Sequence, residues 1–137
     1  MAGIVIVAHT PLASALCDFT AHVFGQTPDR VIAVDVPAYE DIKQTQQRVF
    51  EAVKLAQGEQ GTLILTDIMG ATPANVATKV AKMPECVLPI AVLTGVNLPM
   101  LLRAISHRHE SLESLTEKAL LGGQQGVIRL RLSLIHI

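Results

Sequence analysis

Apolar runs and amphipathic stretches alternate along nearly the whole chain. The apolar runs are rich in Val, Ile, Leu and Ala and have the lengths of buried strands. We predict strands over residues 3–8, 31–36, 62–67, 86–94 and 127–132. The stretches between them carry apolar residues at helical spacing. We predict helices over residues 11–24, 41–56, 73–82, 97–106 and 112–121.

The order β-α-β-α-β-α-β-α-α-β is typical of parallel strands joined by right-handed helical crossovers. It predicts an open, doubly wound α/β sheet with strand order 2-1-3-4, since a barrel of eight units needs a much longer chain. Pro89 inside the fourth run favours an irregular or edge position there. The 137 residues fit one domain, 1–132, followed by a tail, 133–137, to which we assign no role.

Local signals predict how several helices begin and which side chains they bury. Thr10 is expected to cap the first helix, with Pro11 at its first position. Thr72 and Pro73 are expected to do the same for the third helix. In the second helix the candidate inner positions are Ile42, Val49, Val53 and Leu55.

Composition narrows the classes of function. The chain is 50% hydrophobic but only 3% aromatic, which predicts an aliphatic core and argues against an aromatic platform for single-stranded nucleic acid. A net charge of −1 without a long basic run predicts no nucleic-acid partner. Cys17 and Cys86 lie far apart and imply neither a disulfide nor a metal site. No secretory signal is apparent and the most apolar stretch, 87–102, is broken by Pro, Gly and Asn, so we expect a cytoplasmic protein without membrane insertion.

Two residues that are distant in sequence come together in the predicted sheet. His9 closes the first strand and Asp67 closes the third, and ligands bind beyond the carboxyl ends of such strands where the winding reverses. A carboxylate that accepts a hydrogen bond from one ring nitrogen leaves the other nitrogen free as a nucleophile. Each residue also has a simpler interpretation, because His9 could be a solvated loop residue and Asp67 a turn residue.

The segment after Asp67 has features of an anion site. Gly70 allows close backbone approach, Thr72 offers a hydroxyl, and the free N–H groups of the following helix would point at an anion near His9. The start of the first helix, around Thr10 and Leu12, would add more N–H groups. No Walker A or GxGxxG motif is present, so the pocket suits phosphoryl transfer better than nucleotide binding. The same segment could also be only an efficient helix start.

The remaining histidines and one further strand-end carboxylate lack a comparable setting. We expect His107 and His109 to be solvated residues just after a helix and Asp35 to be a loop residue, and we assign no role to His22 or His136.

Three features together resemble a known family: a strand that ends in His9, the pattern DxxGxTPxN at 67–75, and GVNLPML at 95–101. They look like the enzyme IIA domain of the mannose-type (mannose/fructose/sorbose) phosphotransferase system. The resemblance spans about residues 3–131. Each motif alone is weak, whereas their order and spacing together are fairly specific.

The resemblance implies a role for each matched residue. His9 would accept a phosphoryl group from the phosphocarrier HPr and pass it to an enzyme IIB on a separate chain, without a metal or organic cofactor. Asp67 would hold the imidazole, and Thr72 would stand where the family usually has Ser. The residues expected to line or support the phosphate site are Thr10, Gly70, Ala71, Thr72, Pro73, Asn75, Gly95, Asn97 and Pro99.

Family members are cytoplasmic dimers with a flavodoxin-like sheet of four parallel strands. A fifth, C-terminal strand is antiparallel and exchanged between subunits, which would give 127–132 a partner. The sequence departs from the family at Thr10–Pro11, where Gly commonly follows the histidine. It departs again at 68–71, which lacks the usual aromatic residue and second Gly, a change that bears on partner recognition. Two alternatives remain: a regulatory module that signals through His9 phosphorylation, and a small-molecule-binding or hydrolytic flavodoxin-like domain.

Overall fold

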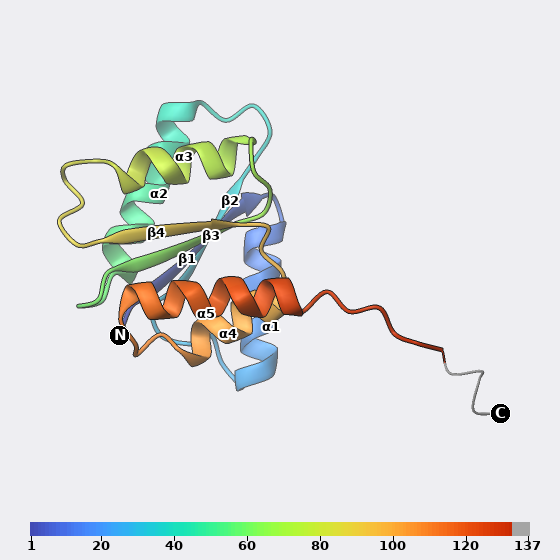
Figure 1. The fold of residues 1–137 in the computed structure, drawn as a ribbon. Helices are drawn as coiled ribbons and strands as arrows, with labels where there is room; N and C mark the ends of the chain where they lie inside the picture. The colour runs from blue at the N-terminus through green and yellow to red at the C-terminus, as the bar shows by residue number, and fades with distance from the viewer. Residues whose placement is uncertain (133–137) are drawn as a thin grey trace.

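The computed structural model describes residues 1–132 and contains one parallel sheet with helices on both faces (Figure 1). The spatial order is β2-β1-β3-β4, which confirms the predicted order. The strands are β1 (Gly3–His9), β2 (Val31–Val36), β3 (Thr62–Thr66) and β4 (Ile90–Thr94). The helices are α1 (Leu12–Phe24), α2 (Ile42–Ala56), α3 (Thr72–Ala81), α4 (Leu98–Ser106) and α5 (Leu112–Gln125).

Side chains of the central strand β1 alternate between two hydrophobic layers. Ile4 and Ile6 pack with α1, α4 and α5 on one face, while Val5 and Val7 pack with α2 and α3 on the other (Figure 1). All four are fully buried, as expected for a parallel strand covered on both sides. The burial fixes the position of β1, and therefore the place where its last residue, His9, reaches the surface.

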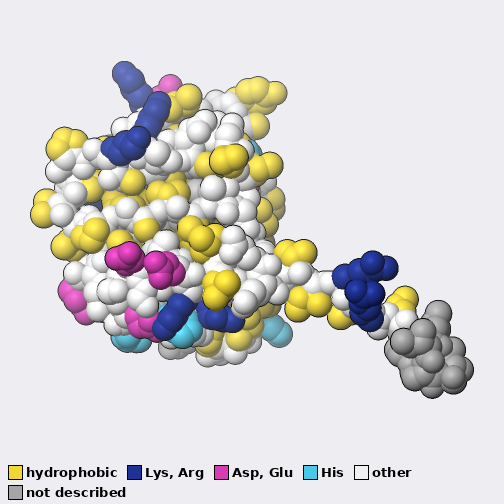
Figure 2. Space-filling view, viewed as in Figure 1, with side chains coloured by type: hydrophobic (Ala, Val, Ile, Leu, Met, Phe, Trp, Pro, Cys, Tyr) yellow, Lys and Arg dark blue, Asp and Glu magenta, His cyan; other side chains and the backbone are white. Residues whose placement is uncertain are grey.

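The fourth and fifth predicted strands differ from the structure. β4 begins at Ile90, because Pro89 precedes it and residues 86–89 form a loop. Residues 127–132 form no strand within the chain, so the antiparallel fifth strand is absent from the described fold. The segment instead extends away from the body and exposes its apolar side chains (Figures 1 and 2). The tail 133–137, with His136, lies outside the described residues.

Helix α5 runs four residues beyond its predicted end, to Gln125. Gly122 and Gly123 suggest a stop, but both are buried inside the helix. A Cβ on Gly123 would lie 2.8 Å from Cε of Met100, and one on Gly122 would lie 2.9 Å from Cβ of Arg103. The pair therefore allows α5 to pack closely on α4 rather than ending it.

Two of the predicted caps are wrong. Pro11, not Thr10, occupies the cap position of α1, and it has no side-chain cap hydrogen bond. Ala71 occupies the cap position of α3, so Thr72 is already the first helical residue.

Burial in α2 follows part of the predicted face. Val49 and Val53 are buried, whereas Ile42 is 50% exposed and Leu55 is 73% exposed. Ile42 is the first residue of the helix, whereas Leu55 lies between the buried Val53 and Ala56 in sequence and points to a different face. Among residues 1–132, no helix combines the length and apolar character that crossing a bilayer demands.

Candidate functional site

His9 is the last residue of β1, whose other six residues are buried, and it lies at the carboxyl edge of the sheet. Residues 3–8 are buried, but the His9 side chain is 53% exposed. It lies opposite Val36 of β2 in the parallel register. The fold therefore exposes an imidazole to solvent at the end of a buried strand.

Asp67 follows β3, the other neighbour of β1, and its carboxylate holds His9 at two points. Its Oδ2 accepts a hydrogen bond from the His9 backbone N–H at 3.0 Å and lies 2.7 Å from Nδ1 of the ring. Its Oδ1 accepts the backbone N–H of Ile68 at 3.0 Å. The Asp67 side chain is only 11% exposed, so its orientation is constrained by its surroundings.

This contact fixes the hydrogen-bonding roles of the two ring nitrogens. A carboxylate accepts hydrogen bonds, so in the neutral ring Nδ1 carries the proton that Asp67 accepts. The lone pair is then on Nε2 of a side chain that is 53% exposed. The arrangement supplies an oriented nucleophile with a nearby negative charge that stabilises any positive charge the ring gains.

Opposing effects act on the pKa of Asp67. Burial is the largest of them and favours the neutral acid, but the hydrogen bonds from the His9 backbone and ring, together with the charge of His9, outweigh it. The pKa of Asp67 therefore lies below its ordinary value, and the carboxylate is ionised at neutral pH.

The segment predicted to bind phosphate, residues 70–72, follows Asp67 in the chain. Gly70 has φ +83°, a left-handed conformation that glycine adopts without strain, and it is exposed. Ala71 precedes α3, whose first N–H groups lack intrahelical partners. Thr72 and Asn75 line a notch of about 340 Å³ between α2 and α3, which neither His9 nor Asp67 lines. The N–H of Thr10 already donates to the carbonyl of Val36 at 3.1 Å, which leaves only its hydroxyl free for a ligand.

Residues 95–99, predicted to support the phosphate site, make contacts that stabilise the fold next to Asp67. Gly95, with φ +84°, donates its N–H to the carbonyl of Asp67 at 3.1 Å. Asn97 caps α4 by accepting the N–H of Met100 at 2.9 Å, and its amide donates to the carbonyl of Gly123 at 3.0 Å. Pro99 packs where Gly126 ends α5, and Pro73 is buried in α3. The side-chain amide of Asn97 is thus engaged in joining α4 to α5.

Sequence reasoning missed the role of Asp35. Its Oδ1 accepts the N–H of Ser14 at 3.0 Å and its Oδ2 accepts the Ser14 hydroxyl at 2.5 Å. A carboxylate therefore caps the first turn of α1 from the neighbouring strand, where the helix dipole favours negative charge. The sequence did contain a signal for this contact: Asp35 lies near the end of β2, and β2 pairs in parallel with β1, which leads into α1.

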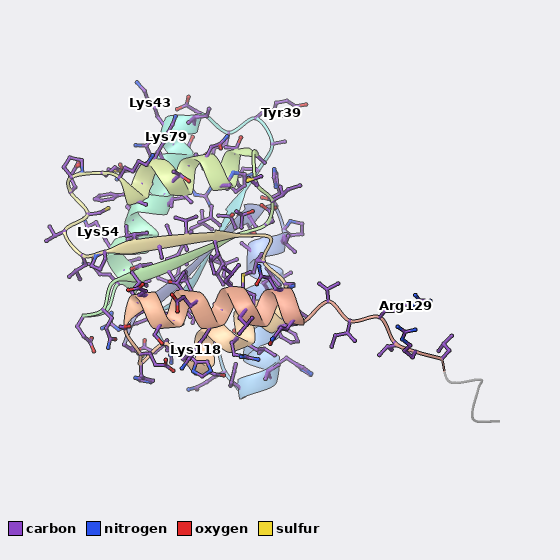
Figure 3. The ribbon with its side chains drawn as sticks, viewed as in Figure 1. Tyr39, Lys43, Lys54, Lys79, Lys118 and Arg129 are labelled. Carbon is purple, nitrogen blue, oxygen red and sulfur yellow. The ribbon has the colours of Figure 1, made fainter. Side chains whose placement is uncertain are left out.

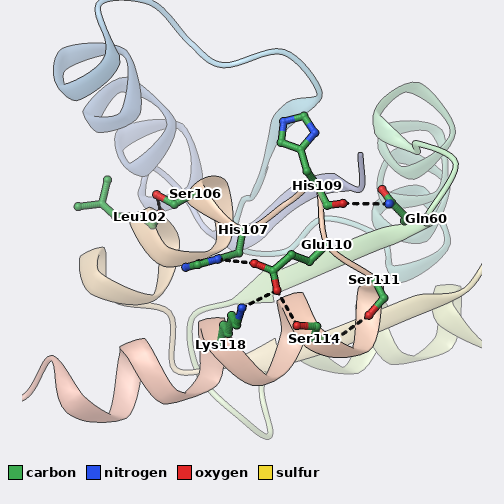
Figure 4. A network of polar contacts seen from close by, with 9 residues as sticks. All are labelled: Gln60, Leu102, Ser106, His107, His109, Glu110, Ser111, Ser114 and Lys118. Atoms are coloured by element: carbon green, nitrogen blue, oxygen red, sulfur yellow. Dashed lines mark hydrogen bonds and ion pairs between the residues drawn. The ribbon is translucent and has the colours of Figure 1, made fainter.

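His107 is also not simply solvated, contrary to expectation. Its Nδ1 lies 2.6 Å from Oε2 of Glu110, whose Oε1 accepts hydrogen bonds from Lys118 and Ser114 at 2.6 Å each (Figure 4). Lys118, Ser114 and His107, in that order, lower the pKa of Glu110 to about 2. This network joins the end of α4 to the start of α5. Within residues 1–132, no cluster of three or more His, Cys, Asp or Glu side chains is arranged to hold a metal ion.

The fold and the site define a doubly wound, flavodoxin-like α/β domain with a carboxylate-held histidine at the carboxyl edge of its sheet. The family model described as the PTS system fructose IIA component matches residues 3–120. The chain belongs to this family, and so to the phosphotransferase components of that system.

Solved structures agree with this assignment. A phosphotransferase system component EIIA from Streptococcus agalactiae is 25% identical with a TM-score of 0.83, and the match covers 94% of this chain and 97% of that one. A mannose/sorbose-specific IIA subunit from Enterococcus faecalis is 26% identical with a TM-score of 0.82, and covers 98% of both chains. A PTS IIA protein associated with the fucose utilization operon of Streptococcus pneumoniae is 24% identical with a TM-score of 0.77, covers 94% of this chain and 96% of that one, and supports the fold alone.

Proposed function

We propose that this protein is a cytoplasmic phosphohistidine carrier. His9 accepts a phosphoryl group from HPr and passes it to an enzyme IIB on a separate chain. The observation that carries the proposal is the contact of Asp67 with Nδ1 at 2.7 Å, which leaves Nε2 of a half-exposed ring available. Membership of the IIA family supports the phosphoryl chemistry.

The transfer is an in-line displacement at phosphorus. The lone pair of His9 Nε2 forms the new N–P bond while the N–P bond of the donor phosphohistidine breaks, and its electron pair returns to the donor imidazole. The proton on Nδ1 stays in the hydrogen bond to Asp67, so the phosphorylated ring is positively charged beside the carboxylate. Onward transfer reverses these roles, with the acceptor as nucleophile and His9 as leaving group. Neither step requires a metal ion or an organic cofactor.

The oxygens of the phosphoryl group need hydrogen-bond donors. We assign this role to the Thr72 hydroxyl and to backbone N–H groups of Gly70, Ala71 and the start of α3, with the Thr10 hydroxyl on the opposite side. Gly70 supports this assignment, because its left-handed conformation turns the backbone between Asp67 and α3. Positioning and charge stabilisation of this kind account for most phosphoryl-transfer catalysis.

We also propose a homodimer, built from residues 1–132 as one IIA domain. Within residues 1–132, strand β4 pairs only with β3 and forms one edge of the sheet, and a shallow apolar groove of about 450 Å³ lies beside it. Its lining consists of Pro89, Ala91, Leu112, Glu113, Thr116 and Glu117. Segment 127–132 of a second copy fits this groove, because it is extended, apolar and 71–84% exposed at Val127, Ile128, Leu130 and Leu132. Its Arg129 and Arg131 complement Glu113 and Glu117 at the groove.

Size-exclusion chromatography tests the proposed dimer. A chain truncated after Gly126 should elute as a monomer, whereas the full chain should elute as a dimer.

Reconstituted phosphorylation tests the carrier function. Phosphoenolpyruvate, enzyme I and HPr are mixed with the full chain, with His9→Ala, and with His107→Ala as the matched control. The full chain and His107→Ala should take up an acid-labile phosphoryl group, and His9→Ala should take up none. Labelling of His9→Ala at the wild-type level would overturn the assignment.

A further inference from the structure

Tyr39 adopts an unusual backbone conformation in the loop between β2 and α2. Its φ of +67° lies in the left-handed region, which is uncommon for a bulky residue and which glycine adopts without penalty. Among the described residues, Arg30 is the other non-glycine residue with positive φ. Residues held in such conformations cluster at active sites, ligand clamps and switch regions.

Arg30 and Tyr39 differ in what their side chains contribute to the fold. The Arg30 carbonyl accepts the N–H of Ile4 at 2.9 Å, and its guanidinium donates to the carbonyl of Gln57 at 2.7 Å, so it joins β1 to the end of α2. The Tyr39 side chain is fully exposed, at 105% of its reference area, and projects clear of the body (Figure 3). It contributes no packing that would offset its strained backbone.

Tyr39 is placed at the same edge of the sheet as His9. Val36, the last residue of β2, lies opposite His9, and its carbonyl accepts the N–H of Thr10. Tyr39 comes three residues later. Further exposed apolar side chains come from the loops and helix starts at this edge: Leu12 (40%), Ile42 (50%), Ile68 (58%) and Met69 (80%). We call these four residues and Tyr39 the apolar rim.

We propose that Tyr39 is the anchor by which this chain binds its phosphoryl-donor protein, an inference that rests on the proposed function. The donor must bring its phosphohistidine into line with His9 Nε2 and therefore covers the apolar rim. In this complex the ring of Tyr39, which is fully exposed in the free chain, becomes buried against the donor. Tyrosine suits this role because it offers a large, rigid contact area and a polar tip.

The composition of the chain supports this role for Tyr39. It is the single tyrosine of the sequence, and residues 68–71 of the neighbouring loop contain no aromatic side chain. The β2–α2 loop therefore supplies the only aromatic side chain of the rim. The exposed ring contributes no packing to the fold, whereas binding a partner would bury it.

The test compares three variants in the HPr phosphorylation assay, with phospho-HPr as the varied substrate. Tyr39→Gly removes the ring and relieves the backbone strain, Tyr39→Phe keeps the ring, and Val87→Ala removes an exposed apolar side chain (89% exposed) from the opposite edge. Tyr39→Gly should raise KM for phospho-HPr about tenfold with little change in kcat. Tyr39→Phe and Val87→Ala should match wild type. Thermal unfolding of Tyr39→Gly should occur at the wild-type temperature or higher.

The results distinguish failure of the Tyr39 anchor from failure of the proposed carrier function. If the wild-type chain takes no phosphoryl group from HPr, the proposed function fails and the anchor fails with it. If wild type is phosphorylated and Tyr39→Gly keeps the wild-type KM, the anchor alone is overturned. A marked loss of thermal stability in Tyr39→Gly would make Tyr39 a structural residue and would also contradict the inference.

Discussion

His9 and His107 both place Nδ1 against a carboxylate, at 2.7 Å from Asp67 and 2.6 Å from Glu110, but the two pairs have different surroundings. Among the described residues, the Asp67 carboxylate contacts the His9 ring and the backbone N–H groups of His9 and Ile68, and it has no ion pair with a lysine or arginine. Glu110 is shared with Lys118 and Ser114. The charge that would stabilise a reacting imidazole is available at the first pair and already compensated at the second.

Position separates the two pairs as well. His9 leaves the central strand at the carboxyl edge, beside two helix starts, and is 53% exposed. His107 ends α4 near the start of β1, where Ala2 donates to the carbonyl of Arg108, and is 31% exposed. A histidine–carboxylate contact is therefore not diagnostic by itself, because its chemistry depends on what else the carboxylate binds and what the free nitrogen faces.

The largest effect is expected from Asp67→Asn. The amide cannot stabilise a positively charged ring and can favour the wrong tautomer, so phosphorylation by HPr should slow by about a hundredfold or more. The initial rate of phosphoryl uptake measures this, with circular dichroism to verify the fold. Glu110→Gln is the matched control and should keep the wild-type rate. An equal loss of phosphorylation rate in both variants would contradict the proposed difference between the His9–Asp67 and His107–Glu110 pairs.

Glu110→Gln should instead lower thermal stability, and the difference should depend on pH. The folded pKa of about 2 lies below the ordinary value of 4.5, so the ionised Glu110 stabilises the fold fully above about pH 4.5. That stabilisation is lost as the pH falls toward 2. The gap in Tm between wild type and Glu110→Gln should therefore be widest near neutral pH and close in acid. A gap that is constant over this range would contradict the ionised network.

The smallest effect is expected from His107→Ala. Lys118 and Ser114 still hold Glu110 after this change, so Tm should fall less than in Glu110→Gln. Scanning calorimetry of both variants at neutral pH gives the order. If His107→Ala is the more damaging variant, the histidine rather than the lysine is the main partner of Glu110.

The sequence predicted the residues whose placement follows from strand topology. Alternation of elements implies the parallel order, and parallel strands end at one edge, so His9 and Asp67 had to meet. The contacts of Glu110 depend instead on the conformation of a short turn, which residue types alone do not determine. Two consecutive glycines, Gly122 and Gly123, favour the end of a helix by propensity. Close packing of these glycines against Met100 and Arg103 instead keeps them within α5. Segment 127–132 has the pattern of a strand, but it leads away from the body of its own chain and pairs with none of the four described strands (Figure 1).

Nitrogen NMR of the ¹⁵N-labelled chain, phosphorylated by HPr, tests the central claim most directly. The spectrum reports which ring nitrogen carries phosphorus and which carries a proton. The account predicts phosphorus on Nε2 of His9 and a proton retained on Nδ1, hydrogen-bonded to Asp67. Phosphorus on Nδ1, or on any residue other than His9, would contradict it.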